Sequence, residues 1–289
     1  MLIGVWEIIK RSLGLYEKNF KKFFGYALLG LVPSILGGSL MGLVFSGLML
    51  IGLDKGGLGT IIGGFILILI VAILTIITSI WISVVVIRVV DTVYLGQPGQ
   101  SFKQVMGGAW KVAWKSFATS FMSGLYAIWP LLVGGILSTV LALSFGTDST
   151  GIKIALFLSG LVCLYGIFHL FYYSIRLSFS VYHAATTSAG VKESMNTSQN
   201  LVRGRWWAIF GRYLGVVVLV GLAMILITSL LQVLSNTGDV MVVVTAVINI
   251  IIRVLIGPFI VSLSVIIYEE TKRLGPVIAS QNAPPSPKI

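Results

Sequence analysis

The residues with the greatest chemical potential are polar side chains inside otherwise apolar stretches: Arg253, Asn249 and His169. An ionisable group in such a stretch marks a functional site by default. At about 1.5 Å per helical residue, Arg253 lies about 20 Å below Val240, where a charge costs at least ~3 kcal/mol. It therefore needs water or a partner, and Asn249, one turn earlier, is the obvious companion. Two interpretations follow: a polar functional cavity, or an arginine that snorkels or locks neighbouring helices together.

His169 lies about 24 Å from Lys153 by the same helical rise, within the aromatic-rich run 168–173. A proton relay would need acidic partners at this depth, and the uncharged runs contain no Asp or Glu. We therefore expect a neutral histidine that is hydrogen-bonded to a neighbouring hydroxyl.

Groups suited to enzymatic chemistry are scarce. General acid–base catalysis needs paired titratable groups within reach, and all nine acidic residues lie at the ends of apolar stretches or in connections. There is no HExxH, Walker or GxSxG pattern, and the single cysteine, Cys163, cannot form a CxxC pair. The sequence predicts no enzyme, no catalytic residue, no cofactor and no metal, and residues 268–273 are interpreted as a solvated helix end. A membrane enzyme that acts on lipid is the weakest hypothesis, because paired catalytic groups are lacking. An inward-facing cluster of His183, Glu269 and Glu270 around a metal would favour it.

Basic residues could instead contact lipid headgroups. Arg88 and Arg176 are far enough from the opposite ends of their apolar stretches to reach a headgroup layer and snorkel. The predicted headgroup contacts are Lys18, Lys21, Lys22, Arg88, Lys111, Lys115, Arg176, Arg203, Arg205 and Arg212. An anionic leaflet attracts each such residue by about 1 kcal/mol. The expected partners are membrane lipids with anionic headgroups and other membrane proteins; nucleic acid is excluded, because no recognition module separates from the apolar stretches.

Six apolar stretches must position these groups. The composition is 57% hydrophobic and 10% charged, and a bilayer core of roughly 30 Å needs about 20 apolar residues per helix. The uncharged runs are 23–53, 56–87, 116–147, 154–175 and 213–238, and a sixth, 240–268, is interrupted only by Arg253. The sequence predicts an all-α integral membrane protein with six transmembrane helices.

The distribution of charge predicts the orientation. Fifteen Lys and Arg residues lie in the first segment, the tail and two alternate connections, against only Lys55 and Lys153 in the other loops. By the positive-inside rule, we expect both termini to be cytoplasmic, in a multi-pass protein of the cell (inner) membrane.

Internal similarity divides the chain into three copies, about 1–97, 98–187 and 188–275. The segments Arg88–Tyr94, Arg176–Tyr182 and Ser262–Tyr268 match at these intervals. Each copy would be a hairpin of two spans with one orientation, related by an axis along the membrane normal. We expect one membrane domain over 1–275 and a disordered, Pro-rich cytoplasmic tail over 276–289.

A cytoplasmic interfacial amphipathic helix is predicted before each hairpin. The first segment has apolar residues at spacings of 3 and 4, typical of a helix in the interface plane: Trp6, Ile9, Leu13, Tyr16, Phe20 and Phe23. Residues 102–117 are similar. The third segment, 191–205, is more polar, and 196–200 resemble a loop or a cap.

The stretch 190–211, together with Gly257-Pro-Phe259 and the charged run after Tyr268, resembles six-span bacterial membrane proteins. These are related to the membrane domain associated with glycerophosphodiester phosphodiesterases and to nearby uncharacterised families. The resemblance is best over residues 175–275. It implies an accessory or stand-alone membrane domain, with no catalytic residues to carry over.

We therefore expect a non-catalytic membrane protein that organises lipid or a protein partner through its interfacial helices and basic surface. The alternative is a small transporter or permease component with an axial cavity near Arg253, Asn249 and His169. Pro33 and Pro130, which kink their helices, would either widen such a cavity or fit neighbouring helices.

Overall fold

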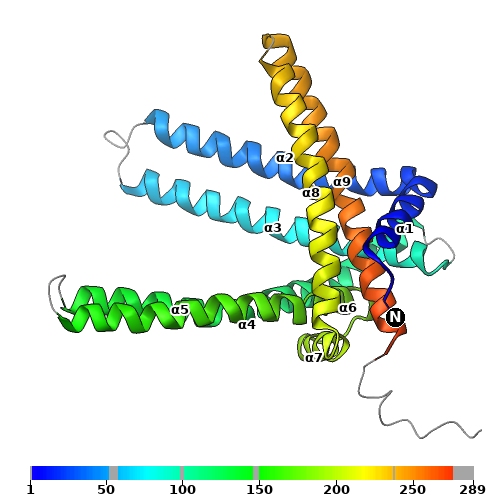
Figure 1. Cartoon of the computed structure of the whole chain (residues 1–289). Coiled ribbons are helices and arrows are strands. Elements are labelled where there is room, and N and C mark those ends of the chain that lie inside the picture. The colour runs from blue at the N-terminus through cyan, green and yellow to red at the C-terminus, as the bar shows by residue number, and fades with distance from the viewer. Residues whose placement is uncertain (1, 52–57, 98–100, 146–149, 237, 276–289) are drawn as a thin grey trace, which may run out of the picture. The chain divides into compact units, whose positions relative to one another are not determined.

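The computed structural model of the protein describes residues 2–51, 58–97, 101–145, 150–236 and 238–275. These residues form α-helices and no strand (Figure 1). The helices are α1 (Val5–Lys18), α2 (Phe20–Ile51), α3 (Leu58–Tyr94), α4 (Phe102–Phe145), α5 (Thr150–Arg176), α6 (Ser180–Thr187), α7 (Val191–Val202), α8 (Trp206–Ser235) and α9 (Asp239–Arg273). The tail predicted to be disordered, 276–289, lies outside the described residues.

Six helical segments among the described residues are long and apolar enough to cross a membrane. They are Phe20–Gly47, Ile62–Tyr94, Phe102–Leu141, Leu156–Thr187, Trp206–Ser235 and Val240–Arg273. The described residues thus confirm the prediction of an all-helical fold with six helices able to span a membrane.

The chain divides into two compact units, which we describe separately. Unit 1 contains Met1–Leu2, Trp114–Tyr213 and Tyr268–Ile289, and unit 2 contains Ile3–Ala113 and Leu214–Ile267.

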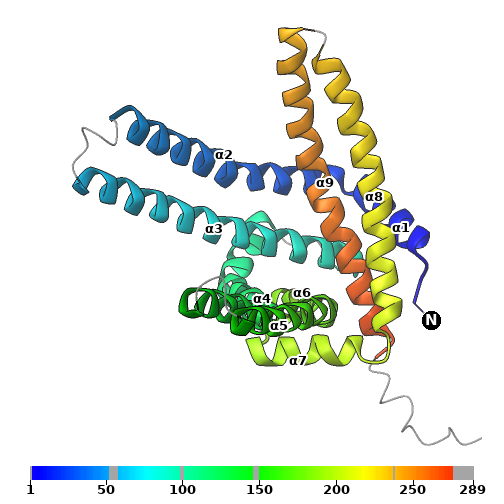
Figure 2. The same cartoon turned by 60° about the vertical axis from the view of Figure 1, so that its left-hand side comes forward.

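In unit 2, α2 and α3 lie side by side in both views (Figures 1 and 2). Two glycines of α2 allow the close approach. A Cβ at Gly30 would lie 3.6 Å from Ile82, and a Cβ at Gly37 would clash with the side chain of Thr75. Small residues favour contacts between membrane helices because they let the two backbones approach closely. The hydrophobic effect does not drive such contacts in a bilayer, since lipid tails are as apolar as the side chains.

α1 is a separate helix because Asn19 ends it. The Asn19 side chain donates to the Leu15 carbonyl at 3.1 Å, and its backbone N–H donates to the Tyr16 carbonyl at 3.2 Å. The Tyr16 ring contacts Phe23 and Phe259, at centroid distances of 5.7 and 6.4 Å. Burial raises the pKa of the Tyr16 phenol, so the ring docks α1 in its neutral form.

The apolar stripe predicted for the first segment does not face a single environment. Ile9 and Phe23 are buried in the protein, whereas Trp6, Leu13 and Phe20 are exposed. Trp6 and Leu13 lie in α1, whereas Phe20 is the first residue of α2, so the stripe is divided between two helices.

The second predicted amphipathic segment, 102–117, is not a separate helix. It is continuous with the following span in α4, which runs unbroken for 44 residues. No proline lies between Phe102 and Pro130, so nothing in the sequence ends the helix at the start of the apolar run.

In unit 1, α4 and α5 approach closely at two glycines. A Cβ at Gly166 would lie 2.9 Å from the Leu131 backbone nitrogen, and a Cβ at Gly134 would lie 3.0 Å from the Cys163 sulfur. Cys163 is thus a small packing residue in this contact.

The prediction of a loop or cap at 196–200 was wrong, because these residues lie within α7. Their side chains favour helix only weakly. Tertiary contacts compensate: Ser194, Ser198, Leu201 and Val202, spaced 4, 3 and 1 residues apart, are buried.

Candidate functional site

A groove of about 700 Å³ lies between α4 and α7 in unit 1. From α4 it is lined by Met122, Leu125, Tyr126 and Trp129. From α7 it is lined by Val191, Lys192, Met195, Asn196 and Gln199. One wall is therefore apolar and aromatic, and the other is polar and carries a cation.

Each wall is one face of a helix. Positions 122, 125, 126 and 129 in α4, and 192, 195, 196 and 199 in α7, follow the spacing i, i+3, i+4, i+7. The α4 wall belongs to a helix apolar enough to cross the membrane. The α7 wall belongs to a short polar helix, so the groove joins an apolar environment to a polar one.

Hydrogen bonds to neighbouring connections fix α7 in place. The Ser198 hydroxyl accepts the Phe179 backbone N–H at 3.1 Å and donates to the Arg176 carbonyl at 2.8 Å. These two backbone groups lie in the turn between α5 and α6. Lys115 Nζ of α4 donates to the Ser188 carbonyl before α7 at 2.9 Å. The α7 wall is thus anchored to the turn between α5 and α6, and α4 is anchored to the connection between α6 and α7.

His169 supports the aromatic wall from behind. Its Nδ1 lies 3.1 Å from the Ala127 carbonyl and donates to it, because a carbonyl can only accept. The ring contacts Tyr126, Trp129 and Tyr173 at centroid distances of 5.9, 6.1 and 4.4 Å. The sequence predicted a hydroxyl partner; the partner found is a backbone carbonyl.

Pro130 explains why α4 has carbonyl oxygens available near this histidine. A proline inside a helix has no N–H and its ring displaces the carbonyl four residues earlier, which is that of Tyr126. His169 bonds the carbonyl of the next residue, Ala127, in the turn that precedes Pro130.

The cationic end of the groove lies at the start of α7. Lys192 is exposed, and the N-cap residue, Gly190, has no side chain that could cap the helix. The first turn of a helix carries a partial positive charge. Glu193 is also in this turn, yet it does not line the groove. Lys192 and the helix end together favour a negatively charged group there.

The three predicted intramembrane polar residues are not gathered into one described site. The Asn249 side chain donates to the Thr245 carbonyl of its own helix at 2.9 Å. Position 253 is helical in α9, but the side chain of Arg253 lies outside what the structure describes. Asn249 belongs to unit 2 and His169 to unit 1.

The predicted headgroup contacts divide into two groups. The exposed ones are Lys18, Lys21, Lys22, Lys111, Lys115 and Arg203. Four arginines are partly buried against protein. Arg176 lies over the rings of Tyr172 and Tyr173, 5.4 and 5.5 Å from their centroids.

Two of the other partly buried arginines donate to backbone carbonyls, and the third packs on a helix. Arg205 donates to the Leu274 carbonyl at 3.2 Å and to that of Gly275, at the end of α9. Arg212 donates to the Leu2 carbonyl at 2.7 Å. A Cβ at Gly108 would lie 3.5 Å from the Arg88 guanidinium, which therefore packs on α4.

The end of α9 is not the solvated cluster that the sequence suggested. Glu269 and Glu270 are only 3% and 8% exposed, and they pair with Lys272 at 2.9 Å and Arg273 at 3.3 Å. His183 Nδ1 lies 3.1 Å from the hydroxyl of the fully buried Tyr268. Among the described residues, no three His, Cys, Asp or Glu side chains are placed to hold a metal.

A second cavity, of about 300 Å³, lies among α2, α3 and α9 in unit 2. Its polar side chains are Tyr26, Ser79 and Ser83, and its α9 wall includes Gly257 and Pro258. The cavity is lined by residues of the spans and carries no charged side chain among its described lining residues.

Sequence reasoning missed the residues of the groove, Lys192 included. The signal was available: 192, 195, 196 and 199 repeat on one helical face, as do 122, 125, 126 and 129. The pairing of these two faces was not available, because it depends on how the intervening α5 and α6 fold back.

Comparison with protein-family models, curated proteins and solved structures found no match.

Proposed function

We propose that this is a non-catalytic membrane protein that binds and organises anionic phospholipid through the groove between α4 and α7. The groove carries the proposal, because it combines an apolar wall on a span with Lys192 on a polar helix. A phospholipid has the same two parts: chains that suit Met122 and Leu125, and a phosphate that suits a lysine beside a helix N-terminus. Such a match favours lipid over a protein partner.

The cationic wall must supply the selectivity. In a bilayer the apolar wall is covered by lipid chains whatever their headgroup, so its burial gives little net free energy. A lysine near the membrane surface contributes about 1 kcal/mol toward an anionic lipid. Asn196 and Gln199 offer further hydrogen bonds to a headgroup or glycerol oxygen.

Exposed tryptophans support an interfacial position for the basic segments. Trp6, Trp110, Trp114 and Trp207 are all exposed, and each is within about five residues of a Lys or Arg. Tryptophan favours the membrane–water interface. We propose that these ends, and both termini, face the cytoplasm at the inner membrane.

The repeated hairpins belong to the same proposal. The segment α1, the first part of α4, and α7 would be the three interfacial elements, each leading into a pair of spans. This arrangement would agree with the resemblance to the membrane domain associated with glycerophosphodiester phosphodiesterases.

Filling the groove tests the proposal. Wild-type protein in nanodiscs of phosphatidylglycerol and phosphatidylcholine should retain the anionic lipid preferentially in native mass spectrometry. Asn196→Trp, on the groove wall, should abolish this preference. Asn200→Trp is the matched control, because Asn200 is exposed on the same helix and does not line the groove. Equal lipid retention by the two variants would reject the proposal.

The cavity in unit 2 favours a second candidate, a transporter or permease component. Its hydroxyl groups could bind a small polar substrate between the spans. In a Cys163→Ala background, Ser83→Cys should then react with a small water-soluble thiol reagent. Failure to react in the folded protein would exclude an aqueous path to this cavity.

A further inference from the structure

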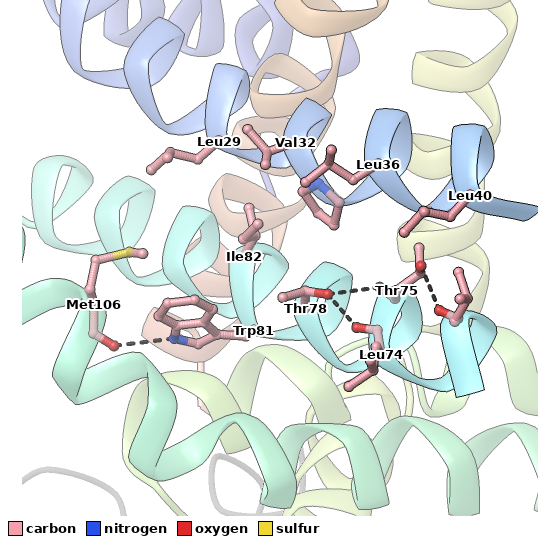
Figure 3. Close-up of a pocket in the computed structure, with 13 residues that line it drawn as sticks. Leu29, Val32, Leu36, Leu40, Leu74, Thr75, Thr78, Trp81, Ile82 and Met106 are labelled. Carbon is pink, nitrogen blue, oxygen red and sulfur yellow. Dashed lines mark hydrogen bonds between the residues drawn. The ribbon is translucent and has the colours of Figure 1, made fainter. Parts of the chain in front are cut away.

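A separate apolar cleft of about 320 Å³ lies between α2 and α3 in unit 2 (Figure 3). From α2 it is lined by Leu29, Val32, Pro33, Leu36, Gly37 and Leu40. Its α3 side includes Leu74, Thr75, Thr78 and Trp81, and Met106 of α4 closes one end. The cleft is independent of the groove in unit 1.

The polar side chains of the cleft are already satisfied by the protein. Thr75 Oγ1 donates to the Val71 carbonyl at 2.8 Å, and Thr78 Oγ1 donates to the Leu74 carbonyl. Trp81 Nε1 donates to the Met106 carbonyl at 3.2 Å (Figure 3). A buried water needs two to four polar partners, and a polar ligand needs free donors or acceptors. The cleft therefore suits an occupant without hydrogen-bonding groups.

The shape of the cleft suits a chain. Gly37 against Thr75 brings the two helices together near one end, and the Trp81–Met106 hydrogen bond braces the other. From position 29 to position 40 the α2 wall is about 16 Å long, close to half of the roughly 30 Å hydrocarbon core. Leu36 and Leu74 are exposed at the rim, so the bilayer can supply the occupant laterally.

We propose that this cleft binds one aliphatic chain of a membrane lipid. The occupant is held by packing against Val32, Leu36, Ile82 and the Trp81 ring, because no polar contact is offered. The occupant we propose is a fatty-acyl chain of a glycerolipid, because the α2 wall is about as long as one leaflet of the hydrocarbon core is thick. The proposal goes beyond the headgroup binding proposed for unit 1.

Photo-crosslinking tests the proposal in nanodiscs that contain phosphatidylcholine with a diazirine in one acyl chain. Mass spectrometry should find label concentrated at Thr75, Thr78 and Met106, above the level at the lipid-facing Ile35. Leu36→Trp, which fills the cleft, should reduce this label to that background level. Ile35→Trp is the matched control, since Ile35 is 55% exposed, Leu36 is 58% exposed, and only Leu36 lines the cleft.

Leu40→Trp is a second variant that fills the cleft, and it tests the proposal if Leu36→Trp misfolds. Every variant must give a single monodisperse peak in gel filtration. Excess unlabelled fatty-acyl lipid should displace the label more effectively than polyprenyl lipid, and the reverse order would overturn the proposal. The proposal would be overturned by even labelling over the spans, by equal effects of Ile35→Trp and Leu36→Trp, or by the absence of displacement by either competitor. The anionic-lipid preference of unit 1 should be unchanged in Leu36→Trp, which separates the two proposals.

Discussion

The charge of Lys192 should set the lipid preference of the groove. A lysine near an anionic surface contributes about 1 kcal/mol, and 1.4 kcal/mol corresponds to a tenfold change in affinity. Lys192→Gln should therefore lower the association constant for phosphatidylglycerol about fivefold. Lys192→Glu reverses the charge and should lower it by about 2 kcal/mol, or about 30-fold. Lys192→Arg should leave it nearly unchanged.

Salt should weaken this preference. The Lys192 side chain is exposed, and the Debye length falls from about 10 Å at 0.1 M to about 3 Å at 1 M ionic strength. The difference between Lys192 and Lys192→Gln should shrink accordingly. Electron paramagnetic resonance of spin-labelled phosphatidylglycerol in phosphatidylcholine bilayers gives the relative association constant for each variant.

Lys103→Glu is the control, because Lys103 is equally exposed and does not line the groove. It changes the net charge as much as Lys192→Glu does. If both reversals reduce phosphatidylglycerol association equally, the basic surface acts as a whole and the reasoning about a groove is refuted. Selective binding in the groove is also refuted if Lys192→Glu weakens phosphatidylcholine association as much as it weakens phosphatidylglycerol association.

Two stability predictions concern the contacts that shape the sites, both measured by thermal unfolding in detergent. Ser198→Ala should destabilise by about 1–3 kcal/mol, because it leaves a buried backbone N–H unsatisfied. Ser194→Ala should be near neutral, since the buried Ser194 hydroxyl has no hydrogen-bond partner among the described residues. A similar loss in both variants would contradict the anchoring of α7 by Ser198. Gly37→Ala should destabilise by about 1–3 kcal/mol through overpacking against Thr75, and Thr75→Ala should partly relieve this loss. Gly38→Ala should be tolerated, because a Cβ at Gly38 would meet open space. Equal effects at 37 and 38 would exclude close packing of α2 on α3.

The spans could be predicted from the sequence because each depends on a local property, the length of an apolar run. The residues at which the spans begin and end could not be predicted in this way. α4 begins at Phe102, well before its uncharged run at 116, because its basic residues do not interrupt the helical backbone. Nothing in an apolarity count distinguishes such a continuation from a separate interfacial helix.

The elements of the candidate site were harder to predict because they depend on tertiary contacts. The weakly helical run 196–200 in α7 is stabilised by Ser198 bonding to a turn some twenty residues earlier. Glu269 and Glu270 look solvated in a charge-rich sequence, yet burial is possible since each pairs with a cation one turn later. His169 bonds a carbonyl beside a proline kink instead of a hydroxyl.

A contact between Lys192 and a lipid phosphate is the most direct test of the proposed function. In phosphatidylglycerol bilayers, solid-state NMR can measure dipolar dephasing of lysine ¹⁵Nζ by lipid ³¹P, with Lys192→Arg identifying the signal. The groove predicts strong dephasing at Lys192, consistent with a charge-assisted hydrogen bond of about 2.8 Å between nitrogen and oxygen, and weak dephasing at Lys103. Dephasing no stronger at Lys192 than at Lys103 would contradict it.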